Sequence, residues 1–269
     1  MRRTTVAVTT ALVVVATLTA VFIVGRDSDD PPSAAAEPSP GTEEVPPTPE
    51  PPSAQPVPPP EPIEPDDSWD GPAGTMTRTG SDSVALTFDD GPSPAWTPKV
   101  LNTLADWGVK ATFCVVGKEA RAYPDLVRDI VDGGHTLCNH SWNHELDLGR
   151  QSVKKIRANL DRTNRAVRDA VPDVDISYYR QPGGQWTKRV VKVALEQGMV
   201  PVHWTVDPSD WDKSVKAGHI EKEVRGATKA GSIVLMHDGG GDRRSTSSAL
   251  KPILSDLTSR FELIALPPR

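Results

Sequence analysis

Two neighbouring carboxylates, Asp89 and Asp90, follow a short apolar stretch. Apolar side chains alternate in this stretch with smaller residues, as in a β-strand: Val84, Leu86 and Phe88. A Gly-Pro pair follows the acids and ends the strand abruptly. Because neighbouring side chains of a strand point to opposite faces, both acids can reach one pocket only if pairing stops at about Phe88 and the backbone bends at the acids. The alternative is an Asp-Asp-Gly-Pro turn with no chemical role.

Two histidines four residues apart, His140 and His144, have the spacing of a metal-binding pair. On a helical turn, positions i and i+4 share a face, so both imidazoles could reach one ion. A carboxylate from the Asp89-Asp90 pair would complete a two-His, one-Asp set with one open position, the pattern of catalytic zinc. Such a metal lowers the pKa of its water to about 7, and the second Asp is then free to act as a base on that water. The histidine pair alone would be weak support for a metal.

Three further segments place polar or aromatic side chains just after expected strands. His237 could protonate a leaving nitrogen, since imidazole titrates near neutrality. Asp210 would raise the pKa of an imidazole beside it, and Trp211 would form a pocket wall. Arg180 could pair with a carboxylate, and the Gly183-Gly184 turn could direct a backbone N–H at a developing oxyanion. The alternatives are a structural histidine, an Asp-Pro turn with a buried tryptophan, and a loop with a surface arginine.

Strand-like and helix-like stretches alternate along the chain after the Asp89-Asp90 pair. Strands are expected over residues 111–116, 135–138, 176–179, 199–206, 232–236 and 261–266. Helices are expected over residues 97–107, 124–131, 152–171, 187–197, 219–229 and 248–257. This alternation predicts parallel βαβ units, in an open doubly wound sheet or in a closed or partly closed barrel. Both architectures place functional groups at the C-terminal ends of strands, where all these motifs fall.

Residues 1–26 have the pattern of a membrane anchor. Two arginines, Arg2 and Arg3, precede an uncharged apolar run of 19 residues from Val6 to Val24, close to the ~20 residues that cross a bilayer. A cleaved signal peptide usually has a shorter apolar core with a cleavage site close behind it. We therefore expect a signal anchor, with the bulk of the chain outside the membrane. A cleaved signal peptide, and hence a secreted protein, is the alternative.

Residues 27–75 are expected to form a disordered linker. Residues 31–65 contain 15 prolines in 35 positions, and such a segment buries too little apolar surface to fold. Residues 27–70 carry 12 acids and no Lys or Arg, which leaves 27 basic and 24 acidic side chains for residues 71–269. That balance is too weakly basic to indicate nucleic-acid binding. Residues 76–269 are long enough for one folded domain.

Taken together and in order, five short motifs resemble those of NodB-type polysaccharide deacetylases, carbohydrate esterase family 4. They are Thr87-Phe88-Asp89-Asp90, His140-Ser141-x-x-His144, Arg180-x-Pro182, Asp207-x-x-Asp210-Trp211 and Leu235-x-His237. The resemblance extends over about residues 82–266. It implies a distorted (β/α) barrel of about seven strands and a divalent metal, usually Zn²⁺ with Co²⁺ possible. It also implies hydrolysis of N-acetyl groups on amino sugars or of O-acetyl groups on xylan.

The resemblance also implies a role for each matching position. Asp89 is similar to the catalytic base and Arg180 to the residue that orients it. The expected metal ligands are Asp90, His140 and His144. His237 is similar to the general acid, with Asp210 tuning it, and the expected substrate contacts are Trp211, Pro182, Gly183 and Leu235. The chain departs from many members at Gly183, where they carry Tyr or another side chain, and this leaves the preferred substrate open.

The two cysteines, Cys114 and Cys138, lie on consecutive expected strands that a barrel would place side by side. A disulfide between them is expected in an extracytoplasmic domain, with two buried thiols as the alternative. The remaining histidines are expected to have structural or surface positions: His135, His203 and His219.

These observations predict a monomeric, metal-dependent deacetylase that is tethered to the membrane and acts outside the cell. Its expected substrate is N-acetylglucosamine in peptidoglycan or in chitin-type oligomers. An acetylxylan esterase is the alternative within the enzymes. A wall-binding module that keeps the fold without catalysis is the alternative from another class.

Overall fold

The computed structural model describes residues 64–65 and 67–269. Within them, seven parallel strands form one sheet: β1 (Val84–Asp89), β2 (Thr112–Val115), β3 (Thr136–Asn139), β4 (Tyr178–Tyr179), β5 (Val200–Pro201), β6 (Ile233–His237) and β7 (Leu263–Ile264). The helices are α1 (Thr97–Asp106), α2 (Gly117–Ala122), α3 (Pro124–Asp132), α4 (Val153–Ala170), α5 (Lys188–Glu196), α6 (Ala217–Ala227) and α7 (Arg244–Arg260). Two 3-10 turns, η1 (Leu148–Arg150) and η2 (Pro182–Gly184), complete the elements.

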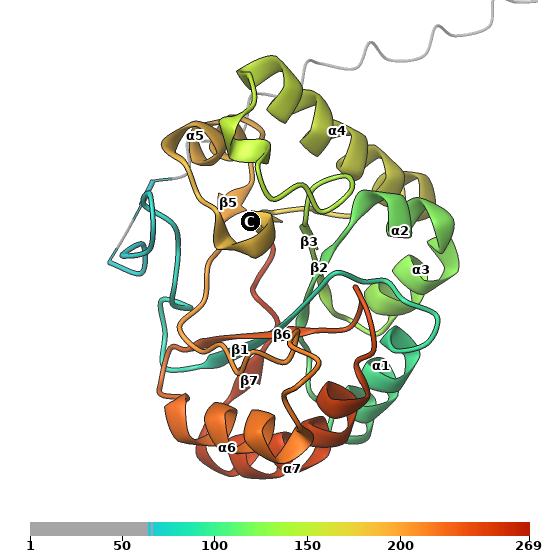
Figure 1. Ribbon diagram of the computed structural model, residues 1–269, viewed down its shortest axis with the longest axis vertical. Helices are drawn as coiled ribbons and strands as arrows, with labels where there is room; N and C mark the ends of the chain where they lie inside the picture. Colours follow the sequence, from blue (N-terminus) through green and yellow to red (C-terminus); the bar gives the residue numbers. More distant parts are fainter. Residues whose placement is uncertain (1–63, 66) are drawn as a thin grey trace, which may run out of the picture. The chain divides into compact units, whose positions relative to one another are not determined.

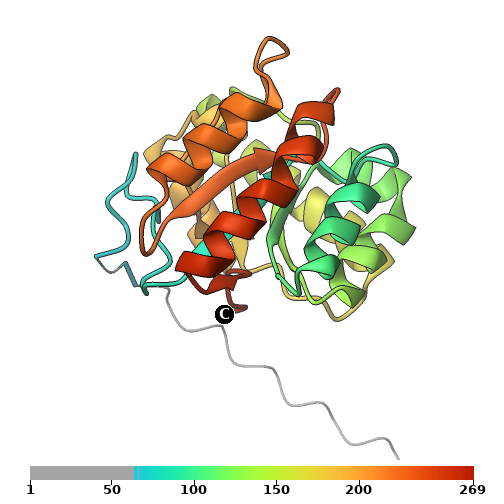
Figure 2. The same cartoon turned by 90° about the horizontal axis from the view of Figure 1, so that it is seen from below.

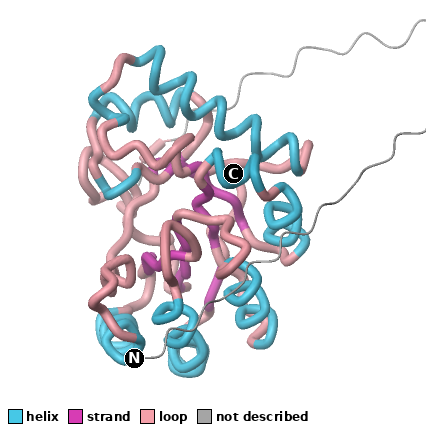
Figure 3. Tube along the Cα trace, turned by 45° about the vertical axis from the view of Figure 1, so that its right-hand side comes forward, coloured by secondary structure: helices cyan, strands magenta, loops and turns pink. Residues whose placement is uncertain are grey.

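The sheet curls into a half-barrel with the helices outside it. Its strand order is β5-β4-β3-β2-β1-β6, and β7 pairs with the start of β1. A parallel bridge between Val206 and Val234 connects the segment after β5 to β6, the strand at the other end of this order. The strands lie inside and the helices surround them (Figures 1 and 3), with α6 and α7 packed side by side (Figure 2). The structure therefore confirms the predicted parallel α/β architecture.

The two faces of β1 serve different purposes. Leu86 and Phe88 point outward into the core shared with the helices, and the Phe88 ring stacks on Phe113 at 5.2 Å. Ala85 points inward, into a smaller core cluster. Because side chains alternate along a strand, Asp89 lies on the same inner face as Ala85. Strand parity thus directs the first acid toward the inside of the half-barrel.

Most predicted elements are present, and the differences have local causes. Helix α2 was not predicted, because Gly117–Ala122 has a single short apolar face and no recognisable start signal. Strands β4, β5 and β7 each keep only two paired residues of the longer predicted strands. Helix α7 begins four residues earlier than predicted, at Arg244.

The folded part includes residues before position 76. Trp69 is 7% exposed and packs in the inner core cluster, and Met76 forms a bridge with Val202. The predicted anchor over residues 1–26 and most of the predicted linker lie outside the described residues. Among the residues that the structure does describe, no helix combines the length and apolar character needed to cross a bilayer.

Cys114 and Cys138 are paired in register on β2 and β3, with their Cα atoms 4.1 Å apart. The structure joins them as a buried disulfide on the inner face, beside the strand ends that carry the predicted site residues.

Replacing both cysteines by serine is expected to lower the unfolding temperature. A disulfide that closes the loop between Cys114 and Cys138 contributes about 3 kcal/mol to the free energy of unfolding. In a domain of this size, that corresponds to a change of roughly 6–12 °C in the unfolding temperature. Differential scanning calorimetry of the wild type and the double variant measures the effect. Equal unfolding temperatures would contradict the expected stabilisation. Two free thiols in the unfolded wild type would show that the disulfide does not form.

Candidate active site

The two acids leave β1 in different directions. Strand pairing continues through Asp89, which is in register with Cys114 on β2 and His237 on β6. The prediction that pairing stops at about Phe88 is therefore wrong by one residue. The bend occurs at Asp90, whose φ of 73° places it in the left-handed region. This bend turns the second carboxylate away from the strand and lets both acids reach one cavity.

The two histidines converge without a helix. His140 follows β3 directly, and the chain to His144 is an irregular turn in which Ser141 and His144 have φ values of 64° and 55°. The prediction that a helical turn aligns them is wrong. The turn is fixed by its own polar groups, because the Ser141 N–H donates to Asn139 Oδ1 at 2.9 Å and the Glu145 N–H to Ser141 Oγ at 3.1 Å. The centroids of the two imidazole rings nevertheless lie 5.2 Å apart.

Asp90, His140 and His144 form a compact triangle of donor atoms. Asp90 Oδ1 lies 3.5 Å from His140 Nε2 and 3.4 Å from His144 Nε2, and all three ligand atoms lie within 4.8 Å of one another. One ion with bonds of about 2 Å to each atom fits such a triangle. Two imidazoles and one carboxylate, with a further position open, suit Zn²⁺, and imidazole also suits related transition metals.

The polar groups of this triangle favour a positive charge between them. His140 Nδ1 lies 2.9 Å from the Arg180 carbonyl oxygen, which can only accept, so Nδ1 carries the proton and the lone pair of neutral His140 is on Nε2. That lone pair faces Asp90 Oδ1, a buried atom with no hydrogen-bond partner. Burial lowers the pKa of His140, but the Asp89 and Asp90 carboxylates outweigh burial and raise it. A bound cation would supply the same positive charge in place of a proton.

Removing one corner of this triangle is expected to weaken metal binding strongly. His144→Ala should raise the dissociation constant for Zn²⁺ by more than about 100-fold, since even an outer partner of a ligand contributes about 10–100-fold. His219→Ala, on the exposed surface of α6, is the matched control. Isothermal titration calorimetry of both variants measures the difference, and equal affinities would show that the ion binds elsewhere.

Asp89 is held by a buried arginine. Arg180 Nη1 donates to Asp89 Oδ1 at 2.7 Å and to Thr87 Oγ1 at 2.8 Å, and the arginine has no exposed surface. The other guanidinium nitrogens donate to backbone carbonyl oxygens of Val202 and His203. Asp89 Oδ2 remains on the metal side, 3.6 Å from His140 Nε2. Asp89 is thus an oriented carboxylate with one oxygen directed at the candidate ion.

His237 is a buried imidazole with a dedicated carboxylate. Its Nδ1 lies 2.6 Å from Asp210 Oδ1, and its backbone N–H donates to Asp210 Oδ2 at 3.0 Å. Thr246 Oγ1 donates to the same Oδ2 at 2.7 Å. Burial lowers the pKa of His237, but the charge and hydrogen bond of Asp210 outweigh burial, and with Asp90 and Asp89 they raise the pKa to about 9. Without a bound cation the imidazole is therefore protonated at neutral pH, and it can donate a proton from Nε2.

One cavity of about 430 Å³ brings these groups together. It is lined by Asp89, Asp90, His140, His144, Leu146, Gly183, Gln185, Trp204, Asp207, Trp211, Leu235 and His237. Trp211 is 53% exposed and forms part of its wall. Of the other expected substrate contacts, Gly183 and Leu235 line the cavity, whereas Pro182 is buried in η2 and does not. Arg180 and Asp210 lie behind the wall and orient residues that line it.

Several residues of the site were not predicted. Asp207 begins the fourth of the five motifs and could have been included on that ground. Trp204 could have been noticed as an aromatic residue near a strand end. Leu146 and Gln185 had no recognisable signal, because loops bring them to the cavity. Asp238, directly after His237, is buried, and burial raises its pKa to about 7 while the Thr97 hydroxyl donates to it.

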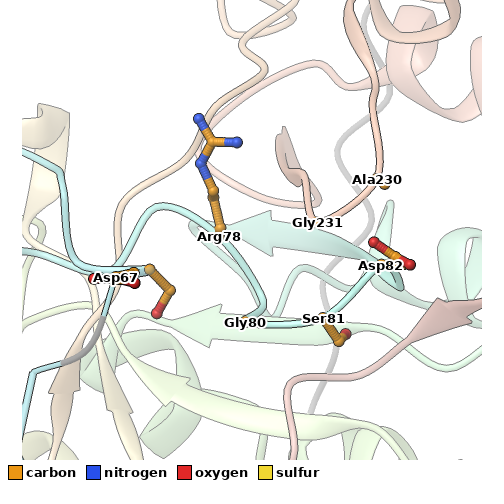
Figure 4. A pocket seen from close by; sticks show the side chains of 8 residues that line it. Asp67, Arg78, Gly80, Ser81, Asp82, Ala230 and Gly231 are labelled. Atoms are coloured by element: carbon orange, nitrogen blue, oxygen red, sulfur yellow. The ribbon is translucent and has the colours of Figure 1, made fainter.

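A second hollow of about 460 Å³ lies at the opposite, N-terminal ends of β1 and β6. It is lined by Asp67, Ser68, Arg78, Gly80, Ser81, Asp82, Ala230 and Gly231. Figure 4 shows that Arg78 and Asp82 point in different directions there, so their charges do not converge on one point. The cavity at the C-terminal strand ends is the better candidate for the active site.

Comparisons with known proteins show which family this chain resembles. The polysaccharide deacetylase family model matches residues 77–202. The chitooligosaccharide deacetylase of Sinorhizobium fredii is 41% identical over 162 residues, which cover 60% of this chain and 74% of that protein. A solved peptidoglycan N-acetylglucosamine deacetylase is 32% identical and has a TM-score of 0.67, with 72% of this chain and 90% of that chain covered.

A family pseudoenzyme from Bacillus anthracis has nearly the same backbone similarity, with a TM-score of 0.66 and 27% identity over 74% of this chain and 70% of that chain. Backbone similarity therefore does not separate active members from inactive ones, and only the side chains of the site can do so. The assignment of this chain to a family rests instead on the family match and on 41% identity to a relative, of which this chain covers 74%. This chain belongs to the NodB-type polysaccharide deacetylases, carbohydrate esterase family 4.

Proposed function

We propose that this protein removes N-acetyl groups from N-acetylglucosamine in a polymeric glycan outside the cell, in a metal-dependent reaction. The observation that carries the proposal is the convergence on one cavity of three metal-ligand donors, an oriented carboxylate and a protonated imidazole. Each of these groups alone also occurs in proteins without such an activity, but metal-dependent hydrolysis of an amide can use all of them together.

The metal site fits a divalent cation, for which Zn²⁺ is the first choice and Co²⁺ the second. Asp90, His140 and His144 would hold it. When bound, it supplies Lewis acidity, which polarises the acetyl carbonyl and makes the attacking water more acidic.

Asp89 and His237 perform the two proton transfers. Asp89 accepts a proton from the attacking water at Oδ2, while Arg180 holds Oδ1 and stabilises the ionised carboxylate. The water oxygen bonds to the acetyl carbon, and the carbon–nitrogen bond then breaks. His237 gives its Nε2 proton to the departing nitrogen, which leaves as an amine, and Asp210 keeps Nδ1 protonated and the ring in position. Acetate and a free amino sugar result.

The backbone of Gly183 supplies the remaining polar contact in this proposal. Gly183 lines the cavity with a φ of 60°, in the left-handed region. Its N–H is the proposed donor to the developing oxyanion. A backbone donor does not depend on the side chain that many relatives carry at this position.

The cavity walls favour a sugar polymer. Trp211 and Trp204 line the cavity with aromatic side chains, and Leu146 adds a 46% exposed apolar side chain. A third hollow of about 370 Å³, lined in part by Trp186, shares Leu146 and Gln185 with the cavity. A chain of sugars can continue from one hollow into the next. Peptidoglycan and chitin-type oligomers are the proposed substrates, since relatives are named for each.

The proposed location follows from the N-terminal sequence. The apolar run within residues 1–26 would anchor the chain, and the proline-rich segment would hold the catalytic domain away from the membrane as a monomer. A secreted form cleaved after the apolar run is the alternative.

An acetate-release panel tests the function. Peptidoglycan, chitin oligomers and acetylxylan are each incubated with the full chain and with Zn²⁺, Co²⁺ or EDTA. Release from the two N-acetylated glycans that EDTA abolishes is the expected result. Release from acetylxylan alone would favour the esterase, and binding to glycan without acetate release under any metal would favour a wall-binding module.

A further inference from the structure

Arg243 is a buried cation that no part of the proposed mechanism uses. It precedes α7 and is only 5% exposed. Its Nε donates to the Gly239 carbonyl oxygen at 2.6 Å, which fixes the side chain against the loop that follows β6. The two terminal nitrogens of its guanidinium then point to different halves of the candidate site.

One terminal nitrogen faces the metal-ligand carboxylate. Arg243 Nη2 lies 3.8 Å from Asp90 Oδ2, the oxygen on the far side from the two histidines. Two glycines also approach Asp90 closely. A Cβ atom added at Gly239 would lie 2.2 Å from the Asp90 carbonyl oxygen, and one added at Gly240 would lie 2.3 Å from Asp90 Oδ2. The loop after β6 therefore encloses Asp90 in its left-handed conformation, and Arg243 provides the positive charge on that side.

The other terminal nitrogen holds the segment of the proton donor. Arg243 Nη1 donates to the carbonyl oxygen of Asp210 at 3.2 Å. The carboxylate of that same Asp210 accepts from His237 Nδ1. A shift of the main chain at Asp210 would move the carboxylate and the imidazole bound to it.

We infer that Arg243 is a positioning residue for both halves of the site. It fixes the Asp90 carboxylate so that Oδ1 faces the two histidines, and it fixes the Asp210 main chain so that His237 faces the same cavity. One guanidinium thereby couples the position of the Asp90 carboxylate to that of the proton donor. The inference rests on the roles proposed for Asp90, Asp210 and His237.

Only an arginine can make these contacts at once. The guanidinium is a rigid plane with donors in three directions. Here Nε and Nη1 donate to the Gly239 and Asp210 carbonyl oxygens, and Nη2 lies at ion-pair distance from Asp90. A lysine at this position keeps the charge but has one nitrogen, which cannot span all three acceptors. Loss of an outer partner of a metal ligand lowers metal affinity or activity by about 10–100-fold.

The test compares Arg243→Lys and Arg243→Met with Arg244→Lys and Arg244→Met in the full chain. Arg244 is the matched control, because it is the next residue and its side chain is 80% exposed. Zn²⁺ affinity is measured by competition with a chelating dye, and kcat and KM by acetate release. Both Arg243 variants should bind Zn²⁺ about 10–100-fold more weakly, and at saturating Zn²⁺ their kcat should fall about 10–100-fold. KM should change by less than about 3-fold, and Arg244 variants should resemble the wild type.

Thermal unfolding of the zinc-free proteins separates positioning from a general effect on folding. A lower unfolding temperature with wild-type Zn²⁺ affinity and wild-type kcat would overturn the inference, as would wild-type behaviour throughout. Should Arg243→Met not fold, Arg243→Lys decides the question, since it retains the charge and most of the length. These outcomes are judged only against a wild type that binds Zn²⁺ and releases acetate. A wild type that does neither would instead refute the proposed function.

Discussion

Asp89→Asn is expected to lose acetate release while it keeps the bound metal. The asparagine retains an oxygen that can accept from Arg180 Nη1, so the side chain can stay in place. Its amide has no basic oxygen left for the proton of the attacking water. General-base catalysis contributes about 10²–10⁴-fold, and kcat should fall by at least that factor.

Zn²⁺ binding should change far less than activity in this variant, because the three proposed ligands are other residues. The full chain with saturating Zn²⁺ is assayed for acetate from chitin oligomers, and the dissociation constant for Zn²⁺ is measured in parallel. Asp106→Asn, on the exposed end of α1, is the control for the chemical change itself. Normal acetate release by Asp89→Asn would remove Asp89 from the mechanism, and loss of Zn²⁺ together with activity would assign it to the metal site.

The sequence was sufficient to predict the site residues that lie at the C-terminal ends of strands. Parallel strands bring their C-terminal ends to one edge, so residues after β1, β3 and β6 had to meet whatever the details of the loops. Asp89, His140 and His237 lie one at each of these strand ends and line one cavity. Alternation of strands and helices was likewise enough to predict the parallel α/β fold.

Loop conformation was the part that pattern reasoning could not supply. The predicted helical turn between His140 and His144 is an irregular turn, because left-handed residues and side-chain hydrogen bonds determine its course. The bend at Asp90 depends in a similar way on tertiary contacts, since the loop after β6 encloses it. Neither feature has a periodicity that a sequence could reveal.

Buried polar partners that lie outside the five motifs were equally inaccessible. Thr246 donates to Asp210 across 36 residues of sequence, and Arg243 reaches both Asp210 and Asp90. A threonine and an arginine at the start of a helix carry no sign of such contacts. They become visible only when the structure shows which buried acceptors they satisfy.

Asp210→Asn is expected to shift the pH dependence of the reaction and to lower its rate. The general acid must be protonated, so activity is retained below the pKa of His237 and lost as pH rises through it. With Asp210 ionised this pKa is raised to about 9. Without that carboxylate, burial is the largest remaining influence and it lowers the pKa, so the alkaline limb of kcat/KM should move down by more than about 2 pH units.

The amide also disturbs the hydrogen bonds of His237. Its single oxygen can still serve the His237 backbone N–H and Thr246, and its NH₂ group then faces Nδ1 as a donor. A donor at this place disfavours protonated imidazole further, which should lower kcat by about 10²-fold or more at neutral pH. A bound cation would lower the pKa of His237 in both proteins, so the shift between them is the informative quantity. Asp212→Asn, two residues away and exposed, is the matched control. Coincident pH profiles for Asp210→Asn and the wild type would show that another group donates the proton to the leaving amine.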